Sequence, residues 1–258
     1  MIQTASFIGS GRVATHLAQA LSPYVEIKHI LSRDLLHAKA LADQVNATPI
    51  DQIEHLEEVD IIFIAVSDAQ IATVAQNLAE QNYQGLVVHT SGSTHIDVLT
   101  QYALKAGVFY PLQTFSFEHQ VDWKNTPLFI EAIAEQHQAD VVELAKKISD
   151  RCYVYDSVQR LSLHLAAVFA CNFTNHCYDI AQQMLSEKKV DFDLLMPLIQ
   201  STTQKLNQTS AEQNQTGPAR RKDENILAMH QEMLKDQHNW QQIYQLMSQS
   251  IMQRFDKE

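Results

Sequence analysis

Two polar side chains in an apolar stretch near the middle of the chain are suited to acid–base chemistry. His164, Val168 and Asn172 follow one another at intervals of four residues, and such positions lie on one side of an α-helix. A histidine exchanges a proton near neutral pH, and an amide can hold a carbonyl oxygen by a hydrogen bond. We therefore predict that His164 and Asn172 are catalytic in the reduction of a carbonyl group. The alternative, a structural histidine in a packed helix, stays open.

A glycine-rich turn follows the first apolar run of the chain. Residues 9–14 read Gly-Ser-Gly-Arg-Val-Ala and precede an amphipathic stretch at 16–21. In this G-x-G-x-x-A pattern Gly9 permits a tight turn, Gly11 lets the backbone approach a pyrophosphate, and Ala14 allows close helix packing. The helix that follows presents its N–H groups to the anion. The turn therefore predicts a dinucleotide site.

The end of the second predicted strand indicates which dinucleotide binds. Strand 24–31 is followed by Ser32 and Arg33, where an NAD-specific domain would present a carboxylate to the ribose. A hydroxyl and a guanidinium suit a 2′-phosphate, so we expect NADP(H) as the cofactor. Two alternatives stay open: a glycine turn that binds no phosphate, and Asp34 as the ribose acceptor of an NAD protein.

Further cofactor contacts are expected where later strands end, because ligands of doubly wound sheets bind at the carboxyl ends of the strands. Strand 60–66 leads into Ser67 and Asp68, although Asp68 is also a good N-cap for a helix that begins at residue 69. The next strand leads into Ser91, and without a G-x-S-x-G elbow this segment predicts a tight turn rather than a serine nucleophile. The expected cofactor contacts, all in these turns, are Gly9, Ser10, Gly11, Arg12, Val13, Ser32, Arg33, Ala65, Val66, Ser67, Asp68 and Ser91.

The 258 residues divide into two regions of different pattern. Up to residue 155 short apolar runs alternate with helical spacing, which is typical of βαβ units and a parallel sheet. Beyond residue 156 long helical spacings take over. We expect an α/β fold in which an N-terminal Rossmann domain with a doubly wound parallel sheet (1–155) precedes an all-helical C-terminal domain (156–258). The later strands are expected at 60–66, 86–89, 107–110, 127–132 and 151–155.

The composition argues against several classes of partner. A formal net charge of -11 and a pI near 5.5 repel nucleic acids and anionic membranes. We find no leader segment and no apolar run long enough to span a bilayer, so we expect a cytoplasmic protein. The three cysteines lack C-x-x-C spacing, and no zinc-type spacing occurs, so neither disulfides nor a metal site is predicted.

Taken together, the motifs resemble those of a bacterial family of Rossmann-like proteins whose C-terminal half is catalogued as domain of unknown function 2520. The resemblance covers nearly the whole chain and rests on residues 9–14, 89–92, 110–115, 164–173 and 216–218. The family is similar to NADP oxidoreductases related to deazaflavin-dependent reductases and to 6-phosphogluconate dehydrogenase. Their helical C-terminal domain commonly dimerises, and some members are similar to an alternative ketopantoate reductase.

The resemblance implies an NADP(H)-dependent oxidoreductase that transfers hydride to a small carbonyl substrate, possible substrates including a 2-keto acid such as ketopantoate. It also implies a homodimer formed through the helical domain, which would bind substrate as well. The expected substrate contacts are Ser91, Tyr110, Gln113, Gly217, Pro218 and Arg220. The alternatives are a non-catalytic NADP-binding sensor or scaffold, and an imine reductase of pyrroline-carboxylate type.

Two positions depart from the family pattern. The family usually has histidine where this chain has Tyr110, and an Arg-Gly-Asp triplet where it has Arg221, Lys222 and Asp223. Tyr110 can still donate a hydrogen bond. A lysine in place of glycine is expected to fill space that a substrate would use. For Arg220, the residues alone fit an anion contact and a solvated turn equally well.

Overall fold

The computed structural model describes residues 1–102 and 104–256. The chain forms two compact units, Met1–Ala170 and Cys171–Glu258. We describe each unit by itself.

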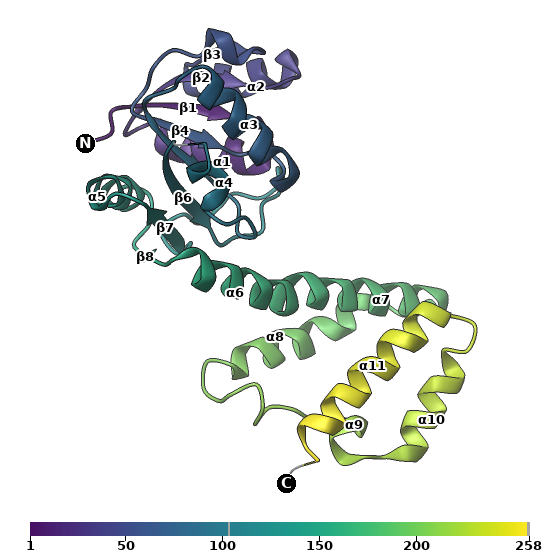
Figure 1. Cartoon of the computed structure of the whole chain (residues 1–258). Helices are drawn as coiled ribbons and strands as arrows, with labels where there is room; N and C mark the ends of the chain where they lie inside the picture. Colours follow the sequence, from purple (N-terminus) through teal and green to yellow (C-terminus); the bar gives the residue numbers. More distant parts are fainter. Residues whose placement is uncertain (103, 257–258) are drawn as a thin grey trace. The chain divides into compact units, whose positions relative to one another are not determined.

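One eight-stranded sheet, in the order β3-β2-β1-β4-β5-β6-β7-β8, is the centre of the first unit (Figure 1). Neighbouring strands are parallel except β6 and β7, which pair antiparallel. The strands are β1 (Thr4–Ile8), β2 (Glu26–Leu31), β3 (Thr48–Ile50), β4 (Ile61–Ile64), β5 (Leu86–His89), β6 (Lys105–Pro111), β7 (Leu128–Ala132) and β8 (Cys152–Val154). The expected doubly wound sheet is confirmed. Strand β3 is an addition to it, because three residues around a proline give no alternating pattern.

Helices cover both faces of this sheet (Figure 1). They are α1 (Arg12–Leu21), α2 (Leu35–Val45), α3 (Asp68–Glu80), α4 (Asp97–Thr100), α5 (Glu135–Ala145) and α6 (Ser157–Ala167), with a short 3₁₀ turn, η1 (Ile53–His55). Apolar residues of α1, α2 and α5 pack on one face around Phe7 and Phe63, and those of α3 and α4 pack on the other around Ile62 and Ile64. Since successive strand residues point to opposite faces, the continuous apolar runs of the sequence fill two cores.

Helix α6 belongs to the first unit, although the sequence places the change of pattern at residue 155. A capping box starts it: Asp156 accepts a hydrogen bond from the Gln159 N–H, and the Gln159 side chain accepts one from the Asp156 N–H. The side chains of Ser157 and Arg160 are buried, which ties the first turn of α6 to the sheet domain. The compact unit therefore extends through Ala170.

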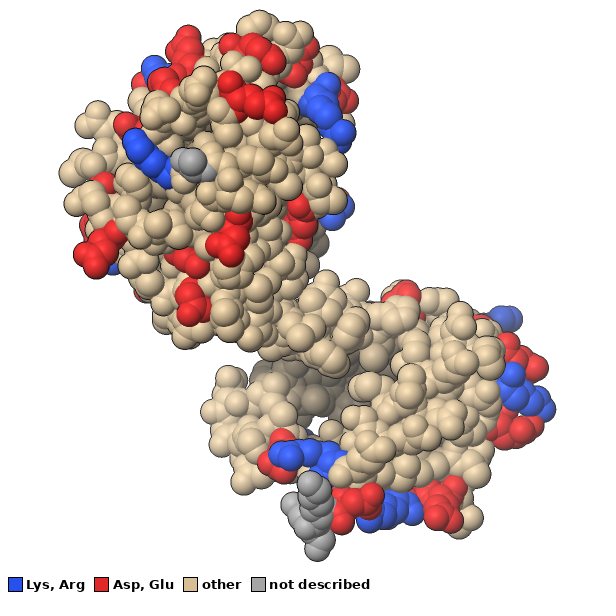
Figure 2. Space-filling model, in the orientation of Figure 1, with Lys and Arg blue, Asp and Glu red and all other residues tan. Residues whose placement is uncertain are grey.

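The second unit is helical. A π-helical segment, η2 (Val168–Phe173), leads into it, followed by α7 (Thr174–Glu187), η3 (Phe192–Leu195), α8 (Met196–Lys205), α9 (Pro218–Arg221), α10 (Glu224–Met233) and α11 (His238–Arg254). Its buried hydrophobic side chains, among the described residues, are Ala219, Leu234 and Phe255. Charged side chains lie mainly at the ends of its helices on the face seen in Figure 2, and the surface between them is uncharged. One copy of this unit therefore has almost no core.

No helix in the part of the chain that the structure describes is long and apolar enough to cross a membrane.

Candidate functional site

A cavity of about 610 Å³ lies in the first unit, at the carboxyl ends of β1, β2, β4 and β5. The expected cofactor contacts all line it. The other lining residues are Ile8, Leu31, Gln70, Val74, Thr90, Gly92 and His164. The fold thus gathers turns that are far apart in the sequence around one space, because parallel strands end at the same edge of a sheet.

The two glycines of the turn between β1 and α1 are required for different reasons. Gly9 has a φ of +117°, and a Cβ built there would lie 2.3 Å from the carbonyl oxygen of Ala65, so the fold itself demands glycine. Gly11 has a φ of -78°, and a Cβ there would meet no atom within 4 Å. Since no atom of the chain requires glycine at position 11, the open space in front of it fits the close approach of a pyrophosphate to the N-terminus of α1.

The end of the cavity near β2 is suited to an additional phosphate. Ser10 Oγ donates to Ser32 Oγ at 3.0 Å, which joins the glycine turn to the end of β2. Arg33 lines the cavity and forms no ion pair or hydrogen bond with any other described side chain. Asp34 is engaged elsewhere, because its carboxylate accepts from the N–H groups of Leu36 and His37 as the N-cap of α2. A cation and a hydroxyl thus face the cavity, while the nearby carboxylate caps a helix.

At the β5 end of the cavity the lining residue His164 pairs with Tyr110, which is buried behind it and does not line the cavity. Tyr110 Oη lies 3.1 Å from His164 Nδ1, and the two rings meet edge to face. Burial raises the pKa of Tyr110 to about 12, while Arg160 lowers it and Asp68 raises it by smaller amounts. The Tyr110 hydroxyl therefore stays protonated at neutral pH. His164 lines the cavity and is partly exposed, so the pair connects the cavity to the buried end of β6.

The segment after β5 forms a turn held by Ser91. Ser91 Oγ accepts from the N–H groups of Ser93 and Thr94 at 3.1 Å each, as the sequence predicts for a tight turn. His89 Nδ1 accepts from the Ser91 N–H at 3.2 Å and makes no bond to Ser91 Oγ. Burial, aided by the charge of Arg160 and by His95, lowers the pKa of His89 to about 3. His89 is thus a neutral, buried residue and does not act as a base for Ser91.

Asp68 lies one position further into its helix than the sequence suggests. Helix α3 begins at Asp68 with Ser67 as the N-cap, and the Ser67 side chain makes no capping bond. The carboxylate of Asp68 in the first turn complements the helix dipole and accepts a short hydrogen bond from Ser93 Oγ. Asp68 therefore joins the β4 and β5 ends of the cavity instead of capping α3.

The remaining predicted substrate contacts belong to other parts of the two units. Gln113 is exposed after β6, where its Oε1 accepts from the Thr114 N–H. Gly217, Pro218 and Arg220 belong to the second unit, and Gly217, with a φ of +101°, is the N-cap of α9. The Arg220 guanidinium lies 3.9 Å from the centre of the Phe255 ring.

Asn172 is exposed and lies in the π-helical segment of the second unit. A π-helix turns through a different angle per residue than an α-helix, so the α-helical spacing that places His164 and Asn172 on one side does not hold across η2. The grouping of these two residues stays a prediction.

The lysine that departs from the family pattern has a local explanation. Lys222 has a φ of 54° at the end of α9, a left-handed conformation that glycine adopts most easily. Its Nζ pairs with Asp256 Oδ1 at 2.5 Å. The side chain is thus held by an ion pair within the second unit.

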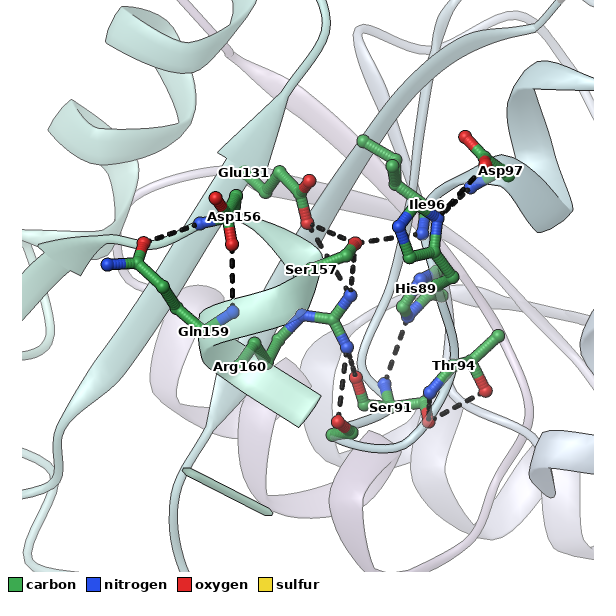
Figure 3. A network of polar contacts seen from close by, with 12 residues as sticks. His89, Ser91, Thr94, Ile96, Asp97, Glu131, Asp156, Ser157, Gln159 and Arg160 are labelled. Carbon is green, nitrogen blue, oxygen red and sulfur yellow. Dashed lines mark hydrogen bonds and ion pairs between the residues drawn. The ribbon is translucent and has the colours of Figure 1, made fainter. Parts of the chain in front are cut away.

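The sequence reasoning missed a buried polar network behind the Ser91 turn (Figure 3). Arg160, on α6, is fully buried and donates to the carbonyl oxygens of Ser91 and Gly92 at 2.9 and 3.2 Å. It also donates to Ser157 Oγ at 2.8 Å and lies 3.5 Å from the carboxylate of Glu131 on β7. The signal available in the sequence is the spacing, because Arg160 lies one helical turn before His164.

Comparisons with known proteins give matches for most of the chain. The model of the family "NADP oxidoreductase coenzyme F420-dependent" matches residues 4–92, and that of DUF2520, a domain of unknown function, matches residues 126–251. A crystal structure from Bacteroides fragilis, named as a candidate NADP oxidoreductase, is 38% identical, with 98% of each chain covered and a TM-score of 0.90. No curated protein matches.

Two more distant structures share the fold. A pyrroline-5-carboxylate reductase from Coxiella burnetii is 12% identical, with 100% of this chain and 98% of the other covered and a TM-score of 0.58. A reductive aminase from Aspergillus terreus, in complex with NADPH and ethyl-5-oxohexanoate, is 16% identical, with 80% of this chain and 76% of the other covered and a TM-score of 0.61. At these identities the likeness concerns the fold alone.

Proposed function

The chain belongs to the family of NADP oxidoreductases that carry the DUF2520 domain, and from this membership we propose that it reduces a small carbonyl compound with NADPH. The observation that carries the proposal is the Tyr110–His164 pair at one end of a cavity whose other end is suited to a 2′-phosphate. A proton-carrying group and a dinucleotide site thus share one space. This juxtaposition is what a ketone reductase needs.

The lining residues fit the cofactor from end to end. The strand order β2-β1-β4-β5 sets the direction: Ser32 and Arg33 would hold the 2′-phosphate, and the N-terminus of α1 after Gly11 would hold the pyrophosphate. The nicotinamide end would then reach the β5 turn at Ser91 and Gly92. When bound, NADPH supplies a hydride to the carbonyl carbon, and the oxygen then takes up one proton to give an alcohol.

His164 is the proposed source of that proton. A tyrosine hydroxyl can donate to a neutral imidazole nitrogen or accept from a protonated one, so Tyr110 holds the His164 ring in both protonation states. Nδ1 faces Tyr110, which leaves Nε2 to face a carbonyl bound in the cavity. Protonated His164 gives its Nε2 proton to the oxygen and is reprotonated from water after product release.

We propose a 2-keto acid such as ketopantoate as the substrate. The support is the family resemblance together with the cationic residues Arg220 and Arg221, whose planar guanidinium groups suit a carboxylate. We propose further substrate contacts from Asn172, Gln113, Gly217 and Pro218 in the homodimer.

The direct test measures NADPH oxidation by the wild-type protein with ketopantoate, other 2-keto acids and a cyclic imine. We expect turnover with a keto acid, and a loss of about 100-fold or more in kcat for His164→Asn with little change in NADPH affinity. His55→Asn, an exposed histidine of η1, is the matched control and should keep full activity. Turnover with the imine alone would favour an imine reductase, and NADPH binding without turnover would favour a sensor or scaffold.

A second copy of the chain is the proposed macromolecular partner. The second unit exposes large apolar side chains, including Phe173, Leu198, Met233, Leu246 and Met247. With so few buried residues a helical unit of this size has little driving force to stay folded alone. Self-association through the second unit would bury this surface, and sedimentation at micromolar concentration is expected to give the mass of a homodimer.

A further inference from the structure

Arg160 is the largest fully buried side chain in the described part of the chain, and its position needs an explanation. Its nearest carboxylate, that of Glu131, is 3.5 Å away, and its Nε has no hydrogen-bond partner. Burial lowers the pKa of the guanidinium, with Glu131 acting in the opposite direction, yet an arginine side chain stays charged. Removing such a charge from water is costly, and a hydrophobic residue of similar volume would avoid the cost.

Two hydrogen bonds of Arg160 go to the backbone of the β5 turn. Nη1 donates to the carbonyl oxygens of both Ser91 and Gly92, and Nη2 donates to Ser157 Oγ, which itself accepts from the Ile96 N–H (Figure 3). Two consecutive carbonyl groups are thus turned toward α6. A guanidinium fork meets two carbonyls and a hydroxyl at once, which the compact ammonium of lysine cannot do equally well.

This arrangement determines where the amide of Gly92 points. The peptide bonds of the described chain are trans, so a carbonyl and the N–H that follows it point in opposite directions. With the Ser91 carbonyl directed at Arg160, the Gly92 N–H is directed away from it. Gly92 is buried, lines the cavity, and its N–H has no hydrogen-bond partner among the described residues. Buried backbone donors are rarely left unpaired, so this N–H calls for a ligand.

Gly92 also contacts the proposed proton donor. A Cβ at this position would lie 2.5 Å from His164 Nδ1 and 2.6 Å from the ζ carbon of Tyr110. The turn therefore packs directly against the Tyr110–His164 pair. Arg160 and His164 lie one turn apart on α6, so one helix supplies both the residue that holds the turn and the residue that the turn contacts.

We propose that Arg160 is a positioning residue for the nicotinamide end of the cofactor: it orients the Ser91–Gly92 peptide so that the Gly92 N–H donates to the carboxamide oxygen. The proposal rests on the cofactor orientation given above, with the 2′-phosphate near Arg33. It does not depend on which substrate is reduced.

The test compares two ligands that share the 2′-phosphate and pyrophosphate but differ in the nicotinamide. Affinities of the full chain for NADPH and for 2′-phospho-ADP-ribose are measured by calorimetry. Arg160→Met should lower the affinity for NADPH about tenfold, which corresponds to the loss of one oriented hydrogen bond. It should lower the affinity for 2′-phospho-ADP-ribose less than about twofold. The NADPH affinity of Arg160→Lys should lie between those of Arg160→Met and wild type. Arg151→Met changes an exposed arginine of the same unit and should bind both ligands as wild type does.

A residue that merely supports the fold would give another result. Equal weakening of both ligands by Arg160→Met, or no change for either, would overturn the proposal. Because the variant removes a buried charge and can fail to fold, wild-type protein labelled with ¹⁵N-glycine gives an independent measurement, since the chain has only 6 glycines. The Gly92 amide resonance, identified by its loss in Gly92→Ser, should shift with NADPH and stay in place with 2′-phospho-ADP-ribose. A Gly92 resonance unmoved by NADPH would contradict the proposal whatever the turnover assays show.

Discussion

The two units of this chain treat their apolar residues in opposite ways. The sheet unit buries Phe7, Phe63 and Phe109 completely and lines its cavity with its own turns. The helical unit leaves Met233 and Met247 more than half exposed, at 69% and 56%. An apolar cavity of about 400 Å³, lined mainly by residues of α7, α10 and α11, lies on that unit.

The two units therefore differ in whether one copy of the chain can bury its own apolar side chains. In the sheet unit the strands and helices of one copy bury each other's apolar side chains. The same copy therefore provides both the folded core and the residues that line the cavity. In the helical unit many large apolar side chains are exposed and few are buried, and this exposed surface is the one that the proposed self-association would cover. The predictions below test each side of this contrast.

The largest effect is expected from a charge in the apolar cavity of the helical unit. Met247→Glu should convert the proposed homodimer to monomer and lower the helical content, because a carboxylate cannot be buried there without a partner. We expect the dimer dissociation constant to rise by at least about 100-fold, measured by sedimentation. Leu36→Glu, at an exposed leucine of the sheet unit, is the control and should have the same mass as wild type. Identical masses for both variants would show that this surface is not the dimer interface.

Within the sheet unit, the two glycines of the first turn should separate fold from ligand. Gly9→Ala places a methyl group against the Ala65 carbonyl at positive φ and should cost about 2–3 kcal/mol of unfolding free energy. Gly11→Ala should leave the unfolding free energy within about 0.5 kcal/mol of wild type and still reduce NADPH affinity about tenfold or more. Chemical denaturation and calorimetry measure the two quantities. A stable Gly11→Ala that binds NADPH normally would contradict the assignment of the pyrophosphate site.

The buried His89 should make the sheet unit sensitive to acid. Its pKa is about 3 in the folded protein and about 6.5 in the unfolded chain, so between these values the unfolded chain binds more protons. The contribution of neutral His89 to the free energy of unfolding is fully present above pH 6.5. It is lost as the pH falls toward 3, by up to about 1.4 kcal/mol per pH unit. His89→Asn, which keeps an acceptor for the Ser91 N–H, should show a shallower loss of unfolding free energy between pH 7 and pH 5. Parallel pH profiles would mean that another group controls acid stability.

The smallest effect concerns cofactor choice. Arg33→Ala should weaken NADPH about tenfold more than NADH, because the side chain lines the cavity near the expected 2′-phosphate and has no hydrogen-bond or ion-pair partner among the described residues. Fluorescence titrations with both cofactors measure the ratio. Equal losses for the two would place the 2′-phosphate elsewhere in the cavity.

The sequence predicted the sheet unit well because its signals are local. Apolar runs, the Gly9–Gly11 turn and the Ser32–Arg33 pair each act within a few residues, and the fold brings them to one edge. The antiparallel direction of β7 relative to β6 could not be predicted, since strand direction depends on the path of the connecting segment and not on the strand residues. Strand β3 has too few residues to show a period.

The part of the site that the sequence did not predict depends on contacts between distant residues. The hydrogen bonds of Arg160 reach back to Ser91 and Gly92, and its carboxylate neighbour Glu131 lies on another strand. Spacing places Arg160 one helical turn before His164, but it does not show that the guanidinium bonds to the backbone of a turn about 70 residues earlier in the chain. The sequence-based grouping of His164 and Asn172 assumed an α-helix throughout, whereas residues 168–173 form a π-helix. Such a change in helix type is not visible in the apolar periodicity.

The order of the two units along the chain has a consequence for synthesis on the ribosome. The interior strand β1 gains its second neighbour, β4, once residue 64 has emerged, so the sheet can start to assemble while the rest is still being made. The apolar helices follow the sheet unit along the chain, so in the proposed homodimer their surface would be exposed only briefly before a second copy covers it. We expect a reversed gene order, with the helical unit first, to depend far more on chaperones, because its uncovered surface would wait for the sheet to be translated.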